Sequence, residues 1–228
     1  MLRGDVAASC DGVVKIYRSA AGDVRALDGV DAEFGSGAVT AIVGPSGSGK
    51  SSLLRIVAGL DRPTAGQVEV GGAWFSGLRT GQLRRARRRL VGYVFQRPSD
   101  NLISYLNVSE HLELAARLRR HRISGEADEL LAMLGLEHRK ANLPHQLSGG
   151  EQQRVAFAQA VIGAPAIVVA DEPTAELDSH SAEALIATVA ELARMGTAIV
   201  LATHDRPVFE AADHQLWLAN GAVAKDTG

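Results

Sequence analysis

The apolar residues of this chain gather in short runs that no charge interrupts, and stretches with helical spacing separate them. The clearest runs cover residues 38–43, 91–95, 166–171 and 197–203. Their length suits strands, and their apolar character on every position suits strands that are buried on both faces. Alternation of such strands with helices predicts a parallel sheet covered by helices.

Other parts of the chain have a different texture. Residues 12–17, 30–34 and 67–70 suggest an antiparallel sheet near the N-terminus, and the tail predicts a hairpin that turns at Asn220–Gly221. Residues 108–136 are helix-like, with leucines at helical spacing. We therefore predict one α/β domain over 1–228, with a core of about 1–96 and 165–228 and a helical subdomain of about 97–164.

Composition and charge narrow the class of protein. The 228 residues are 46% hydrophobic and 22% charged with a net charge of −2, which is typical of a soluble domain and argues against a general nucleic-acid binder. No run approaches the roughly 20 apolar residues of a membrane helix, and the N-terminus lacks a secretion signal. Cys10 is the single cysteine, so an internal disulfide is excluded.

One local exception to this neutrality is a basic run. Arg84, Arg85, Arg87, Arg88 and Arg89 stand within six positions. A solvated helix face is the ordinary interpretation. The alternative is a surface that meets anionic lipid headgroups or an acidic segment of a membrane partner.

The sequence GPSGSGKS at 44–51 fits the pattern of a loop that binds the phosphates of a nucleoside triphosphate. Its glycines let consecutive N–H groups point inward at the start of a helix expected over 51–60. Lys50 is expected to bridge the β- and γ-phosphates, and the Ser51 hydroxyl to ligate Mg²⁺. We expect the whole segment to bind ATP: Gly44, Pro45, Ser46, Gly47, Ser48, Gly49, Lys50, Ser51 and Ser52.

Two carboxylates follow the strand expected at 166–171. Ligands of open α/β sheets lie at the carboxyl ends of the strands, so these acids are expected at the phosphates. Asp171 is expected to hold Mg²⁺, through water, and Glu172 to polarise the attacking water. The plain alternative is that Asp-Glu-Pro only ends a strand and starts a turn.

A second glycine-rich sequence, LSGGEQ at 147–152, resembles the signature of the ATP-binding-cassette (ABC) ATPases. Independently of that resemblance, Ser148 suits a helix N-cap, and Gly149, Gly150 and Glu151 leave a first turn with open N–H groups. The resemblance implies a P-loop NTPase (RecA-like) core with an N-terminal antiparallel β subdomain and an inserted helical subdomain. It also implies that two copies pack head to tail, each signature contacting the γ-phosphate held by the other copy.

Four more positions match the family's motifs. Tyr17 resembles the aromatic residue that stacks on adenine, its alternative being a strand core residue, and Gln96 resembles the glutamine that contacts Mg²⁺ or the attacking water. Asp178 resembles the acid of the loop that crosses the dimer interface, and His204 the histidine that contacts the γ-phosphate. The other six histidines are expected to be surface or core residues. Gln159 departs from the family, whose members usually carry Arg there, and we expect one weaker polar contact.

The resemblance implies an ATPase subunit that uses ATP and Mg²⁺ and drives separately encoded transmembrane permease subunits. The texture around the motifs is most similar to the lipoprotein-releasing and macrolide-exporting (LolD/MacB-type) branch, so we expect export or mechanical work on the envelope. The chain is then expected to be cytoplasmic, peripheral on the inner face of the cell membrane. The alternative is a soluble ABC ATPase of DNA repair or translation. A P-loop kinase or GTPase does not explain LSGGEQ.

Overall fold

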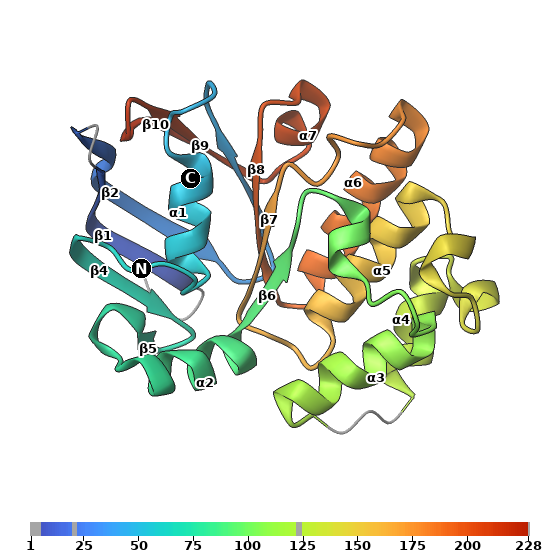
Figure 1. Ribbon diagram of the computed structural model, residues 1–228. Coiled ribbons are helices and arrows are strands. Elements are labelled where there is room, and N and C mark those ends of the chain that lie inside the picture. Colours follow the sequence, from blue (N-terminus) through green and yellow to red (C-terminus); the bar gives the residue numbers. More distant parts are fainter. Residues whose placement is uncertain (1–5, 20–21, 122–124, 228) are drawn as a thin grey trace.

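The computed structural model describes residues 6–19, 22–121 and 125–227. Residues 122–124, which fall inside the helix-like stretch expected at 108–136, lie outside the described part. Two sheets and the helices around them form the fold (Figure 1). Within the described residues no helix is both long and apolar enough to span a bilayer.

The larger sheet has the strand order β10-β9-β3-β8-β7-β6. All neighbouring pairs are parallel except β9 and β10, which form the predicted tail hairpin. Asn220 and Gly221 turn it with φ angles of 51° and 80°. The sequence did not predict that β9 would pair with β3. The strands are β3 (Val39–Val43), β6 (Val91–Val94), β7 (Ile167–Asp171), β8 (Ala198–Thr203), β9 (His214–Ala219) and β10 (Ala222–Asp226).

The smaller sheet is antiparallel, as predicted, with the order β2-β1-β4-β5. Its strands are β1 (Val6–Ser19), β2 (Gly22–Gly35), β4 (Ala65–Val70) and β5 (Ala73–Trp74). Helix α1 (Lys50–Val57) lies between the two sheets (Figure 1). Its buried Leu53, Leu54 and Ile56 join one apolar core with residues of both sheets. Burial on both sides therefore fixes the position of the helix that follows the phosphate loop.

The remaining helices cover the opposite face of the larger sheet or its edge (Figure 1). They are α2 (Thr80–Leu90), α3 (Val108–Arg119), α4 (Glu126–Met133), α5 (Gly149–Val161), α6 (Ser179–Arg194) and α7 (Arg206–Glu210), with short 3-10 turns at Phe75–Gly77, Pro98–Asn101, Glu137–Arg139 and Pro144–Gln146. Strand β7 serves both cores: Ile167 and Val169 face α1, whereas Val168 and Ala170 pack with the helices. This second core runs unbroken from α3, α4 and α5 into the sheet, so the subdomain boundaries at 97 and 164 stay a prediction.

Two local differences have plain causes. The helix expected over 51–60 ends at Val57, because Gly59 takes a left-handed φ of 64° beside the Phe75 ring. The basic run lies on α2, where Arg84, Arg85, Arg88 and Arg89 are exposed and Arg87 donates to the Gly59 carbonyl at 3.2 Å. Exposure of these four arginines fits both a solvated helix face and a surface that meets a partner.

Gly92 allows α5 to pack closely against β6. A Cβ atom at this position would lie 2.4 Å from the Ala160 carbonyl oxygen. We predict that Gly92→Ala lowers the free energy of unfolding by about 1–3 kcal/mol, because either the strand or α5 must move. Urea unfolding measures this loss. Gly77→Ala is the control, since a Cβ there meets nothing within 4 Å, and equal losses in the two variants would contradict the prediction.

Candidate functional site

The loop between β3 and α1 needs glycine for close approach. A Cβ atom on Gly44 would lie 2.3 Å from the Leu218 carbonyl oxygen, and one on Gly49 would lie 2.5 Å from that of Ala26. The loop is also tied to the tail hairpin, since the Gly221 N–H donates to the Ser48 carbonyl at 3.1 Å. Strands from both sheets therefore hold the loop in place before any ligand binds.

The N-terminus of α1 has the features of an anion-binding site. No side chain caps this helix, and no acidic residue lies in its first turn. The first N–H groups of a helix lack intrahelical partners and carry a partial positive charge, which suits phosphate oxygens. Nearby, the buried Ser48 hydroxyl has no hydrogen-bond partner among the described residues. Buried polar groups are rarely left unpaired, so both observations fit a bound anion.

Among the described residues, Lys50 donates hydrogen bonds to backbone carbonyls and to no acid, although it interacts electrostatically with Asp171. Its ammonium group donates to the Gly44 carbonyl at 2.8 Å and to that of Pro45 at 3.1 Å, and the residue is 9% exposed. Neither partner is an acid, and these two bonds use two of its three N–H donors. A buried cation without a counter-ion is costly. A phosphate in the loop would supply the missing negative charge.

At the carboxyl end of β7, two acids lie close to this loop. Asp171 is half-buried, and burial raises the pKa of its carboxyl group, with Glu172 adding to the rise, while a hydrogen bond from Ser51 opposes it. These adjacent oxygens are the hard donors that Mg²⁺ prefers. No cluster of three or more His, Cys, Asp or Glu side chains able to hold a metal occurs among the described residues, so a metal here would depend on the nucleotide for further ligands.

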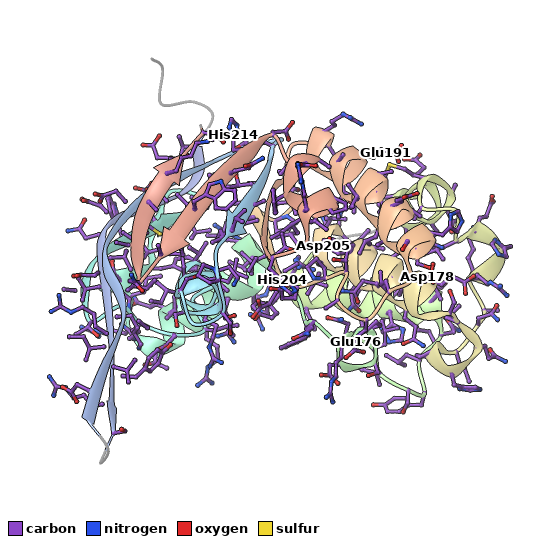
Figure 2. All side chains as sticks on the ribbon, turned by 90° about the horizontal axis from the view of Figure 1, so that it is seen from above. Glu176, Asp178, Glu191, His204, Asp205 and His214 are labelled. Carbon is purple, nitrogen blue, oxygen red and sulfur yellow. The ribbon has the colours of Figure 1, made fainter. Side chains whose placement is uncertain are left out.

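Glu172 and His204 form a pair across the ends of β7 and β8. Glu172 Oε1 and His204 Nδ1 lie 2.8 Å apart in a hydrogen bond, with the Glu172 side chain 16% exposed and that of His204 73% exposed. His204 is labelled in Figure 2. Glu172 has a φ of 46°, and its N–H donates to the Ala202 carbonyl at 2.9 Å. A left-handed glutamate is strained, and such strain is often found at functional sites.

One cavity of about 720 Å³ unites most of these groups. Glu172 and His204 line it together with the phosphate loop and a part of β2. Ser48 and Gly44 lie behind its wall, and Asp171 reaches it through Ser51. Arg25 on β2 also lines the cavity, and the sequence analysis missed it. No motif marks this arginine, because only the folding of the antiparallel sheet over the loop brings it there.

Tyr17 belongs to β1, and its hydroxyl group lies beside the start of α1. The residue does not line that cavity. Its hydroxyl group donates to Asp61 at 3.2 Å and lies 3.4 Å from the Ser52 hydroxyl, and the Lys15 ammonium lies 4.8 Å from the ring centroid. Tyr17 is 38% exposed, so it is no core residue of the strand. An exposed ring beside the phosphate loop is suited to stacking on a flat base.

The signature segment lies elsewhere. Ser148 caps α5: its Oγ accepts from the Glu151 N–H at 3.2 Å, and Glu151 Oε2 accepts from the Ser148 N–H at 2.7 Å. Burial alone would raise the pKa of Glu151, but hydrogen bonds from Ser148 and Arg139 lower it overall. Asp178 caps α6 in turn by accepting from the Ser181 N–H at 2.9 Å. A Cβ atom on Gly150 would lie 2.9 Å from that of Ser181, so α5 and α6 begin side by side.

The structure therefore divides the expected site residues into two groups. The phosphate loop, Asp171, Glu172 and His204 come together, with Tyr17 beside them. Ser148, Gly149, Gly150, Glu151 and Asp178 form a second group, none of which lines the cavity at the loop. Gln96 belongs to neither group, since it is exposed after β6.

A parallel sheet with this phosphate loop, sandwiched α1 and paired carboxylates defines the class of P-loop nucleoside triphosphatases. Comparison with known proteins then gives the family. Residues 27–175 match the family described as ABC transporter, and the chain belongs to it.

Curated relatives identify the branch. The chain is 41% identical over 211 residues to the pyoverdine export ATP-binding/permease protein PvdT of Pseudomonas fluorescens, and equally to the macrolide export ATP-binding/permease protein MacB of Marinobacter nauticus. Each match covers 90% of the chain but 31% and 32% of the relative. The chain thus spans about a third of the length of these relatives. It is an ABC ATPase of the MacB-like branch that the sequence predicted.

Solved structures agree with the fold. The dimeric post-hydrolysis state of the ATP-binding cassette MJ0796, bound to ADP and Pi, superposes with a TM-score of 0.82 and 37% identity, covering 96% of this chain and 97% of that one. The cbiO1 structure from Clostridium perfringens gives 0.81 and 28%, covering 97% and 88%. The predicted fold class is confirmed.

Removing the Lys50 ammonium should weaken nucleotide binding. We predict that Lys50→Ala raises the Kd for ATP by roughly 10- to 150-fold, since a hydrogen bond to a charged group contributes about 1.5–3 kcal/mol. Titration with a fluorescent ATP analogue measures this change. Lys225→Ala, on exposed β10, serves as the control for loss of a positive charge. Equal affinity in the two variants would contradict the assigned role.

Proposed function

We propose that this chain is the ATP-hydrolysing subunit of a membrane transporter and that it works as a head-to-tail pair around two ATP molecules. One observation carries the proposal: the chain has a phosphate site at α1 and a second helix N-terminus, at Ser148, that lines no part of that site. A second copy supplies the γ-phosphate that Ser148 would otherwise lack.

In the proposed site, the loop N–H groups and Lys50 bind the phosphates of ATP. Ser51, Gln96 and Asp171 hold Mg²⁺, with Asp171 acting through water. When bound, Mg²⁺ neutralises charge on the phosphate oxygens. Two features of the structure support this arrangement: Ser51 and Lys50 both act to lower the pKa of Asp171, and Lys50 donates to backbone carbonyls rather than to an acid. Tyr17 stacks on adenine, and its bond to Asp61 holds the ring.

Hydrolysis needs a base beside the γ-phosphate. Glu172 polarises the attacking water, and its hydrogen bond with His204 keeps its carboxylate oriented at the cavity wall. His204 contacts the γ-phosphate with the ring nitrogen that is not occupied by Glu172. The partly buried setting of Glu172 favours this chemistry, because charge interactions strengthen where water is scarce.

The second copy completes the site. Ser148 Oγ accepts one hydrogen bond inside its own helix, and its O–H stays available to donate to a phosphate on the partner. Gly149 is exposed at the start of α5, whereas Gly150 is buried against Ser181. Arg139 forms an ion pair with Glu151, which offsets part of the negative charge that would repel the incoming phosphate. Asp178, at the neighbouring start of α6, crosses the interface.

The proposed membrane partner is a permease, because the names of the relatives combine an ATP-binding part with a permease part. A groove of about 510 Å³ beside α2 offers a docking surface. Its floor includes Leu60, Val91 and Tyr93, and four arginines of the basic run line its rim, whereas no acid lines it: Arg84, Arg85, Arg87 and Arg88. Such a groove suits an amphipathic helix with acidic residues.

Removal of the proposed base should trap the dimer. We predict that Glu172→Gln keeps ATP binding but lowers the hydrolysis rate by about 10²- to 10⁴-fold, so that a closed dimer accumulates with ATP and Mg²⁺. Size-exclusion chromatography with light scattering measures its mass. Adding Ser148→Arg should restore the monomer, because the long side chain occupies the partner's phosphate site. A monomeric Glu172→Gln protein in the presence of ATP and Mg²⁺ would contradict the shared-site proposal.

The basic groove should determine whether the permease binds. We predict that Arg88→Glu abolishes copurification with a co-expressed permease while ATP binding stays unchanged, because a like charge then meets the acidic helix. Arg194→Glu, at the end of α6, is the control. Retained copurification, or capture of Arg88-containing protein by anionic vesicles alone, would contradict a protein partner at this groove. Persistent ribosome or DNA association without a permease would favour the soluble alternative.

A further inference from the structure

The segment that carries Gln96 is held by side-chain amides on both sides of that residue. Asn101 Oδ1 accepts from the Phe95 N–H at 2.7 Å. Asn101 Nδ2 donates to the Phe95 carbonyl at 3.1 Å and to the Arg97 carbonyl at 3.0 Å. One asparagine therefore binds the backbone before and after Gln96, so residues 95–101 form a closed loop with a defined shape.

Two glutamines of α5 hold this loop to the helix. Gln153 is 0% exposed; its Nε2 donates to the Phe95 carbonyl at 3.4 Å, and its Oε1 accepts from Asn101 Nδ2 at 3.4 Å. Gln159 donates to the Asn101 carbonyl at 2.6 Å. Gln159, which stands where members of the family usually carry Arg, therefore still makes a polar contact. A fully buried amide is costly to leave unpaired, so the loop and α5 separate only with difficulty.

The other attachments of the loop are weaker. Arg97 and Glu176 form an ion pair at 3.6 Å with both side chains largely exposed, and exposed pairs of this kind contribute little. Gln96 itself is exposed, and its presentation follows from the loop that carries it. The chain continues into β6 at one end of the loop and toward α3 at the other, where the Ile103 N–H donates to His111 Nε2 at 2.8 Å. The loop is therefore bound more firmly to α5 than to the elements that surround the phosphate cavity.

We propose that Asn101, Gln153 and Gln159 form a clamp that makes residues 95–101 move with α5, so that α5 determines how Gln96 is presented to ATP. The three are positioning residues, since none lines the phosphate cavity. The inference rests on the proposed function, in which Gln96 acts on ATP bound to its own subunit and Ser148 on ATP bound to the partner. Because Ser148 caps the same helix, engagement of Ser148 at one ATP alters Gln96 at the other.

A double-mutant cycle tests the clamp. Gln153→Met keeps the shape of the buried side chain and removes both of its hydrogen bonds. We expect kcat for ATP hydrolysis to fall by about 10- to 100-fold, as misplacement of a reacting group does, with the Kd for ATP unchanged. In a Gln96→Ala background the same substitution should cause no further fall, because the residue that the clamp positions is already gone.

Three further variants separate positioning from stability. Gln215→Met on β9 is the matched control, since it also removes a hydrogen bond from a side-chain amide to a backbone carbonyl, that of Phe209 at 2.9 Å. We expect wild-type kcat from it. If Gln153→Met does not fold, Gln159→Met carries the same expectation, and Gln159→Arg should retain wild-type kcat, because arginine also donates to the Asn101 carbonyl.

The outcomes are distinguishable. Additive losses in the cycle, an unchanged kcat in the clamp variants, or an equal loss in Gln215→Met would overturn the clamp while leaving the ATPase proposal intact. Absence of hydrolysis by the unmodified chain with its permease would instead overturn the proposed function, and the clamp with it.

Discussion

The unpaired N–H groups at the start of α1 are the constraint on which the rest of the structure depends. The body of this helix is buried, but the residues at its start line the cavity, and no side chain caps them. The positive end of the helix and the buried Lys50 therefore share one unmet requirement, a negative charge in the loop. A phosphate group bound in the loop would supply this negative charge.

Burial of α1 between two sheets explains why the loop keeps its shape. Strand β7 places Ile167 and Val169 in one core and Val168 and Ala170 in the other, so both cores fix the position of Asp171 at its end. The carbonyl groups of Ala26 and Leu218, from different sheets, leave no room for a side chain at Gly49 or Gly44. Rigid packing thus aims the acids at the loop without any contact from a ligand.

The second helix N-terminus follows a different strategy. Helix α5 satisfies its own first turn with Ser148 and Glu151, so it stands without a ligand. What it offers to a partner is a hydroxyl donor and open N–H groups rather than an unmet charge. Its deeper attachment is to the Gln96 loop through Gln153. One helix thereby links the signature segment to the loop that carries Gln96.

The amino-acid sequence alone determined the features whose chemistry is local. The phosphate loop, the cap at Ser148, the tail hairpin and the buried strands were predicted because backbone conformation, capping and apolar runs depend on neighbouring residues. The predicted end of the helix after the phosphate loop, at residue 60, was wrong. The Phe75 ring that lies beside Gly59 comes from another element. Only the tertiary structure decided that Arg25 lines the cavity, that β9 joins β3, and that Asn101 meets Gln153. These contacts join residues far apart in the chain, and packing geometry, which no local pattern encodes, selects them.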